Sequence, residues 1–169
     1  MSRTPHSHSW PARPQRAFTL VEIAVVVLII GILAALAIPS YRRVVIKSKA
    51  TATVNNLRTF SAAFSSFNLA NGRYPTPGAV PGDPGELGIA VTDTFKTPSP
   101  IGGKYMWHVA PTGDPFYGKA ALGIATVSES TLSNDMELLE LVDQMIDDGN
   151  LYDGNIQLGA AELVYVIEK

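Results

Sequence analysis

The 169-residue sequence contains no cysteine and only three histidines. Without cysteine a disulfide framework is excluded, so an exported domain of this size depends on its hydrophobic core or on a bound ion for stability. Two of the histidines lie within residues 1–17, and His108 has no cysteine, second histidine or G-x-S-x-G partner with which to build a zinc or hydrolase site. We therefore predict that the protein is not an enzyme and assign it no catalytic residues.

Charge is almost absent from one long stretch of the chain. Glu22 is the only charged residue among the 21 residues from Phe18 to Ile38, and Pro39 follows them. A helix of that length spans about 31 Å at about 1.5 Å per residue, which matches the hydrocarbon core of a bilayer. The run predicts a transmembrane helix over residues 18–39, preceded by a leader of residues 1–17 that contains no acid.

Glu22 is costly at this position and needs a compensating charge. A carboxylate within hydrocarbon costs about 2.5–3.5 kcal/mol on insertion scales. If the chain is cut between Ala17 and Phe18, the new α-amino group lies at the same membrane depth as Glu22. That amine can neutralise Glu22 of a neighbouring subunit when helices pack side by side, which predicts polymerisation through this helix with Glu22 as the assembly residue.

The segment Phe18–Glu22 (FTLVE), with a basic residue shortly before it and an apolar helix behind it, resembles the N-terminal signature of type IV pilins and pseudopilins. Gly31 and Pro39 also fit that pattern. The resemblance implies that a prepilin peptidase removes the leader after Ala17 and methylates the new N-terminus at Phe18. Ala17 departs from the glycine that the family has before the cut, and alanine is the nearest substitute in size, so we expect slower cleavage.

The resemblance also implies a function. The protein would be a structural subunit of a type IV pilus or of a type II secretion pseudopilus. It would begin as a single-pass protein of the inner membrane and then enter a periplasmic or extracellular filament. Its partners would be the prepilin peptidase and methyltransferase, identical or related pilin subunits, and an inner-membrane assembly platform. Many pilins carry a C-terminal disulfide and many pseudopilins do not, so the lack of cysteine favours a pseudopilin.

Three other interpretations of the apolar run stay open. Cleavage at the A-x-A site Ala35–Ala37 would make it an ordinary secretory signal peptide and release a soluble protein that begins at Ile38. The helix could also be a plain membrane anchor. In the last interpretation, the exported domain binds a ligand or partner without polymerising.

Beyond Pro39 the helical pattern continues over residues 40–72. Apolar residues recur there at spacings of three and four and predict one buried stripe, and Asn71-Gly72 predicts the helix end, with kinks near Gly31 and Pro39. Residues 73–103, rich in proline and glycine, predict a long loop with little regular structure. The stripe comprises Val54, Leu57, Phe60, Phe64 and Phe67.

The remaining chain alternates in the manner of strands. With the loop before it, it forms a predicted exported globular domain over residues 73–169. Ser133-Asn134-Asp135 is predicted to cap a helix that runs to Ile146, with Glu137, three residues after Asn134, completing a capping box. The fold class is therefore α+β, a long N-terminal helix packed on a small antiparallel sheet as in pilins. The predicted strands are Lys104–Pro111, Lys119–Val127, Asn155–Leu158 and Glu162–Glu168.

Without its leader the chain carries ten basic and fifteen acidic residues, and no basic patch indicates a nucleic-acid partner. The loop Asp147–Asn155 contains several hard oxygen donors, the type of ligand that calcium prefers, but their spacing does not fit an EF-hand. Turn chemistry is the alternative, with Gly149 ending the helix and Asp153-Gly154 forming a tight turn. We assign no cofactor and no metal ligand, and keep calcium as a candidate, since the major pseudopilin of type II secretion binds calcium in its C-terminal loops.

Overall fold

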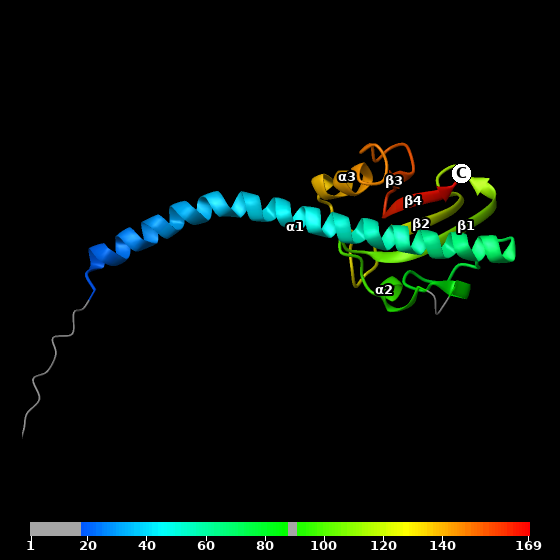
Figure 1. Cartoon of the computed structure of the whole chain (residues 1–169), viewed down its shortest axis with the longest axis horizontal. Coiled ribbons are helices and arrows are strands. Elements are labelled where there is room, and N and C mark those ends of the chain that lie inside the picture. The colour runs from blue at the N-terminus through cyan, green and yellow to red at the C-terminus, as the bar shows by residue number, and fades with distance from the viewer. Residues whose placement is uncertain (1–17, 88–90) are drawn as a thin grey trace, which may run out of the picture. The chain divides into compact units, whose positions relative to one another are not determined.

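The computed structural model describes residues 18–87 and 91–169, so the predicted leader, including Ala17, lies outside the described residues (Figure 1). The chain divides into two units, one that ends at Tyr41 and one from Arg42 to Lys169. The helix α1 (Leu20–Asn71) contributes residues to both. We describe each unit by itself.

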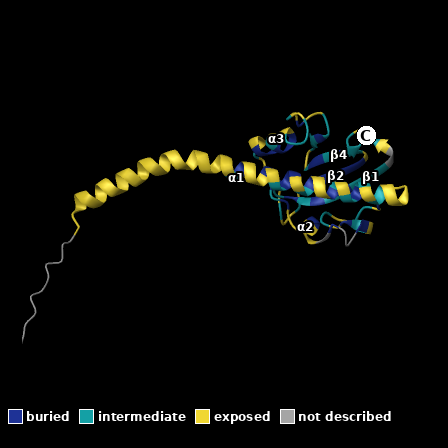
Figure 2. Cartoon of the chain, viewed as in Figure 1, coloured by how far each residue is buried: buried dark blue, intermediate teal, exposed yellow. Residues whose placement is uncertain are grey.

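In the unit that ends at Tyr41, α1 begins at Leu20 and continues through Gly31 and Pro39 without a break. Every residue from 18 to 41 is exposed, as the yellow ribbon of Figure 2 shows. Among the described residues, α1 is the one helix long and apolar enough to cross a membrane. A helix that is apolar on all sides is stable only when lipid or other protein covers it, because water solvates such a surface poorly.

In the unit from Arg42 to Lys169, the second part of α1 buries the predicted stripe. Val54, Leu57, Phe60 and Phe64 are at most 3% exposed, and Phe67 packs against the same core while partly exposed. The helix ends as predicted. The backbone N–H of Gly72 donates to the carbonyl of Asn68 at 2.8 Å, and Gly72 has a φ of 69°, a conformation that glycine adopts without strain.

The stripe packs on a four-stranded antiparallel sheet in the order β1-β2-β4-β3, which confirms the predicted fold class. β2 lies between β1 and β4, with Tyr105 opposite Ile124 and Leu122 opposite Tyr165. All four predicted strands exist, with their ends shifted by up to three residues. Their bounds are β1 (Lys104–Asp114), β2 (Gly118–Ala125), β3 (Ile156–Leu158) and β4 (Glu162–Glu168).

Aromatic rings dominate the contact between α1 and β1. The Phe64 ring stacks on Trp107, with ring centroids 3.8 Å apart and planes within 10° of parallel. Phe60 meets Tyr105 edge to face at 4.8 Å and Phe95 at 5.1 Å. These five rings are at most 2% exposed. The alternation predicted for β1 is therefore correct, because Tyr105 and Trp107 both face the helix.

Two short helical segments lie inside the predicted loop 73–103, namely η1 (Gly85–Leu87) and α2 (Thr92–Lys96). The prediction missed both. α2 contributes Phe95, which is fully buried against Phe60. A five-residue helix has too few turns to show an apolar period, and this one is held by the burial of a single ring.

The helix α3 (Met136–Gln144) has Asp135 as its N-cap residue, which lies within the predicted capping segment 133–135. The predicted capping box between Asn134 and Glu137 is wrong, because the cap is one residue later. The Asp135 side chain makes no capping hydrogen bond. Its carboxylate instead pairs with Arg42 of α1 at 3.2 Å, while its backbone N–H donates to Ser133 Oγ. The helix also ends at Gln144, two residues before the predicted end, because the chain turns at Met145.

Candidate functional site

The start of α1 carries a reciprocal capping arrangement between Thr19 and Glu22. The backbone N–H of Glu22 donates to Thr19 Oγ1 at 3.2 Å. In return, Glu22 Oε2 accepts from the backbone N–H and from the hydroxyl of Thr19, each at 3.2 Å. Two donors at the helix start are thereby satisfied, which is the purpose of a capping box. Our sequence reasoning missed Thr19, although the spacing T-x-x-E is the signal that would have identified it.

This arrangement turns the Glu22 carboxylate toward the N-terminal end of α1. Phe18, the residue just before Thr19, is 78% exposed, and among the described residues no ion pair involves Glu22. Among the described residues, the Glu22 carboxylate therefore accepts hydrogen bonds from Thr19 and has no basic partner. The assignment of Phe18 to processing and methylation and of Glu22 to assembly stays a prediction, and Ala17 lies outside the described residues.

The helix surface that surrounds Glu22 is apolar and uncovered. Leu20 is 86% exposed, and the exposed fractions of the neighbouring aliphatic side chains exceed 45%. Because burial of apolar surface contributes roughly 25 cal/mol per Å², such a face gains free energy from any apolar partner that packs on it. The exposed side chains of this face include Val21, Ile23, Val25, Val26, Val27 and Leu28.

A second group of acids lies after α3, where calcium was considered. Asp147 and Asp148 come together with Asp143 of α3, and one ligand atom of each lies within 4.8 Å of the others. Asp143 is fully buried. Its burial, with the nearby charges of Asp147 and Asp148, raises the pKa of Asp143 to about 6, although the backbone N–H of Gly149 opposes the rise. The sequence prediction named the loop but missed Asp143, which lies on the helix.

The turn chemistry predicted for this loop is also present. Gly149 and Gly154 have φ values of 88° and 91°. The Asp153 carboxylate accepts a hydrogen bond from the backbone N–H of Gly154 at 2.7 Å and so belongs to the turn. Gly149 does not cap α3, which ends earlier. Gly149 and Gly154 thus allow the turns of the loop, and Asp153 takes part in one of them. Asp147 and Asp148 of the loop belong instead to the acidic cluster with Asp143.

His108 belongs to a group of polar side chains that joins β1 to β4. Its Nε2 lies 3.2 Å from Glu162 Oε2, and its ring stacks on Tyr117 at 4.2 Å. The Tyr117 hydroxyl donates to Glu162 Oε1, and this hydrogen bond is the main reason that the Tyr117 pKa rises to about 12. A Cβ on Gly123 of β2 would lie 2.7 Å from Glu162 Oε2, so glycine lets these side chains meet across β2.

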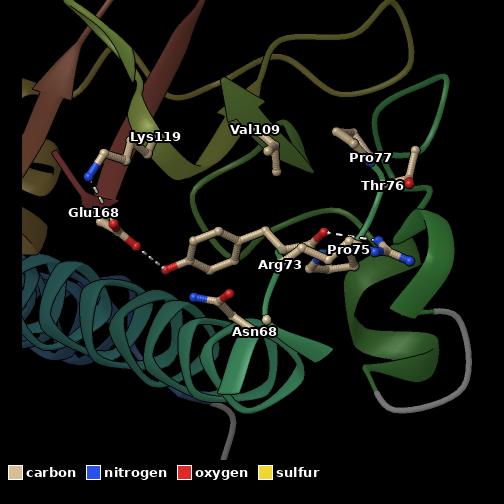
Figure 3. Close-up of a pocket in the computed structure, with 10 residues that line it drawn as sticks. Asn68, Arg73, Pro75, Thr76, Pro77, Val109, Lys119 and Glu168 are labelled. Carbon is tan, nitrogen blue, oxygen red and sulfur yellow. Dashed lines mark hydrogen bonds and ion pairs between the residues drawn. The ribbon is translucent and has the colours of Figure 1, made fainter. Parts of the chain in front are cut away.

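A surface pocket of about 570 Å³ lies beside the end of α1 (Figure 3). Its polar groups bond to one another. The Tyr74 hydroxyl donates to Glu168 at 2.9 Å, Lys119 pairs with Glu168 at 3.1 Å, and Arg73 pairs with Glu86 at 2.7 Å. The pocket therefore presents charges that are already matched within the domain. Residues that line it include Asn68, Arg73, Thr76, Val109, Lys119 and Glu168.

Comparison with known proteins identifies the N-terminal segment directly. Residues 12–38 match the model of the prokaryotic N-terminal methylation motif. This range contains the predicted cleavage position, Thr19, Glu22 and the whole apolar run from Phe18 to Ile38. Thr19 and Glu22, which form the capping arrangement, therefore lie within the matched methylation motif.

Several curated proteins are similar to part of the chain. The chain is 41% identical over 64 residues to the type II secretion system core protein G of Pseudomonas aeruginosa, covering 38% of this chain and 45% of that protein. It is 38% identical over 79 residues to fimbrial protein Q of Moraxella bovis, covering 46% of this chain and 50% of that protein. The matches to these curated relatives therefore span about half of the relatives' length.

Two further comparisons reach into the exported domain. A fimbrial protein of Dichelobacter nodosus is 36% identical over 102 residues, covering 60% of this chain and 61% of that protein. The solved structure of the major type IV pilin PilA1 of Clostridium difficile matches 73% of this chain and 97% of that one, with a TM-score of 0.50 and 15% identity. At that identity the likeness concerns the fold, a long helix packed on an antiparallel sheet.

Proposed function

We propose that the chain is a structural subunit of a type IV pilus or a type II secretion pseudopilus, because it carries the prokaryotic N-terminal methylation motif and is similar to proteins of both systems. The observation that carries the proposal is Glu22, a lone carboxylate at the start of an apolar helix that the described part of its own chain leaves uncovered. Both features call for a partner outside the chain: apolar surface for the helix and a positive charge for Glu22.

Assembly would supply both at once. The leader is removed after Ala17, Phe18 becomes the methylated N-terminus, and the subunit waits in the inner membrane. When helices pack side by side, the amine of one subunit replaces the Thr19 hydrogen bonds as the partner of a neighbour's Glu22. The ion pair lowers the free energy of the assembled state, because an unpaired carboxylate in hydrocarbon costs about 2.5–3.5 kcal/mol on insertion scales. The subunit then leaves the membrane and is incorporated into a periplasmic or extracellular filament.

The prepilin peptidase and methyltransferase, related pilin subunits and an inner-membrane assembly platform are the partners that this proposal requires. Its support is the matched motif over residues 12–38 and the similarity to the core protein G and fimbrial proteins. A plain anchor would need neither a carboxylate in the apolar run nor the T-x-x-E spacing that orients it.

The test is Glu22→Ala expressed in the protein's own host. We expect normal membrane insertion, a processed chain that begins at Phe18 and is about 14 Da heavier than its sequence through one methyl group, and loss of incorporation into sheared filaments. Truncating one partner of a buried charge pair costs about 2–5 kcal/mol, or about 30-fold or more in binding. The readout is the ratio of filament to membrane protein on immunoblots.

Glu140→Ala is the matched control, because it removes an exposed carboxylate of α3 that makes no ion pair among the described residues. It should enter filaments at the wild-type level. Incorporation of Glu22→Ala at that level would refute the role of Glu22. A wild-type chain that begins at Ile38 would instead indicate a signal peptide, and an uncut chain would indicate a plain anchor.

A further inference from the structure

Four basic residues form a belt on α1 shortly after the apolar run. All four lie within residues 42–49 and are exposed. Glu22 is the only acid of α1, and the next acid along the sequence is Asp83. The cations therefore have no counter-charge nearby on their own helix. The basic belt comprises Arg42, Arg43, Lys47 and Lys49.

The folded domain compensates only one charge of the basic belt. Arg42 pairs with Asp135 at 3.2 Å, and an ion pair exposed to this degree contributes little. Among the described residues, Arg43, Lys47 and Lys49 make no ion pair. Arg43 and Lys47 are also four residues apart on one face of the helix, where like charges repel each other. An anion that lies between them would remove this repulsion.

The spacing along α1 brings the basic belt to the headgroup layer of a membrane that the apolar run crosses. Arg42 follows Ile38 by about 6 Å of helix and Lys49 follows it by about 16 Å, at about 1.5 Å per residue. The headgroup layer extends about 5–7 Å beyond each face of the hydrocarbon core. Helical side chains slope toward the N-terminus of their helix, so the long lysine side chains extend back toward the headgroups.

Apolar residues beside the cations are also exposed. Tyr41, which precedes Arg42, is 72% exposed, and Val44, which follows Arg43, is 66% exposed. Tyrosine is enriched where a membrane meets water, and helices that bind membrane surfaces combine basic side chains with apolar ones. The segment therefore presents cations for phosphate groups together with apolar side chains for the adjoining acyl chains.

We propose that the basic belt binds the phosphate groups of anionic phospholipids on the exported side of the membrane and so holds the subunit there before assembly. Basic residues that flank a membrane span are usually on the cytoplasmic side, so four of them on the exported side oppose the usual bias. Binding of phosphate by arginine and lysine accounts for their presence. The inference rests on the proposed insertion of α1 into the membrane, but not on filament formation.

The test measures lipid binding by the full-length protein in dodecyl maltoside micelles. Dioleoylphosphatidylglycerol, which is anionic, or zwitterionic dioleoylphosphatidylcholine is added, and native mass spectrometry gives the affinity of each lipid. A Lys or Arg near an anionic membrane surface strengthens binding about fivefold. We therefore expect Arg43→Gln/Lys47→Gln to bind phosphatidylglycerol about 25-fold more weakly than the wild type and phosphatidylcholine equally well. Higher ionic strength should reduce the difference between wild type and variant, because salt screens exposed charges.

Two matched controls separate the basic belt from net charge. Lys96→Gln removes an exposed lysine of α2 that makes no ion pair among the described residues, and it should bind phosphatidylglycerol as the wild type does. Lys47→Gln should bind it about fivefold more weakly. Arg43→Lys/Lys47→Arg keeps both charges and should stay within about twofold of the wild type. The arginines of residues 1–17 are present in every variant, so differences between variants report on the basic belt.

The proposal is overturned if Arg43→Gln/Lys47→Gln binds phosphatidylglycerol as tightly as the wild type, or if Lys96→Gln weakens binding as much as Lys47→Gln does. Unchanged phosphatidylglycerol affinity together with loss of filament incorporation in the double variant would also overturn it, and would assign the basic belt to acids of a neighbouring subunit. Glu22→Ala should bind phosphatidylglycerol as the wild type does, so failure of the filament proposal and failure of lipid binding are observed separately.

Discussion

Phe64→Ala is the substitution that should separate the folding of the exported domain from the events at the N-terminus. The Phe64 ring is fully buried and stacks on Trp107 at 3.8 Å. A buried aromatic side chain removes about 150–250 Å² from water, which at about 25 cal/mol per Å² corresponds to about 4–6 kcal/mol. Phe→Ala substitutions in protein cores cost about 3–5 kcal/mol, and the stability of a whole domain is about 5–15 kcal/mol.

The assay is urea unfolding of the processed chain in detergent micelles. The chain has two tryptophans, Trp10 and Trp107, and removal of the leader leaves Trp107 as the only tryptophan to report on the core by fluorescence. Circular dichroism provides a second probe that does not depend on the ring next to the substitution. With a denaturant slope of about 2 kcal/mol per M, the loss should lower the unfolding midpoint by about 2 M.

Leu69→Ala is the control for this prediction, since Leu69 also belongs to α1 but is 87% exposed. It should change stability by less than about 0.5 kcal/mol. Neither substitution touches Glu22, so processing should be normal in both. If Phe64→Ala cost less than about 1 kcal/mol, α1 would not be the central element of the domain core, and the reasoning that begins from the apolar stripe would be wrong.

Two further predictions concern acidic groups that are hydrogen-bonded. Hydrogen bonds from Arg73 and the Thr76 backbone lower the pKa of Glu86 from 4.5 to about 2. The stability that this carboxylate contributes is therefore present above pH 4.5 and lost as the pH falls toward 2, and a carboxyl ¹³C NMR titration with a midpoint near 4.5 would contradict this. Thr19→Val should destabilise the first turn of α1 by about 1 kcal/mol and speed amide exchange at Glu22, whereas Thr19→Ser should exchange as the wild type does.

The long elements could be predicted because their patterns repeat. The strand Glu162–Glu168 has the bounds expected from its alternation, and the stripe of α1 lies in the core as its spacing indicates. Both are cases in which one physical requirement, an apolar face toward the core, is repeated over several turns or residues. A single residue that departs from the pattern therefore does not hide the helix or the strand.

What could not be predicted depends on single contacts between distant residues. The predicted capping box of Asn134 and Glu137 does not form, because Asp135 is the N-cap residue and its carboxylate pairs with Arg42, 93 residues earlier. α2 exists because Phe95 fits between rings of α1 and β1. The sequence pattern did not single out Asp143, which is fully buried and lies beside Asp147 and Asp148 of the following loop. Pattern reasoning has no access to such contacts, because they have no period.

Glu22 is a carboxylate within a run of apolar residues, and it has no ion pair among the described residues. A sequence under selection for stability alone would carry an apolar side chain at this position at little cost. The presence of Glu22 is explained if its counter-charge comes from outside the chain, and in the proposed filament that charge is the amine of the next subunit. Assembly and domain folding then separate cleanly, because neither Phe64→Ala nor Leu69→Ala changes Glu22.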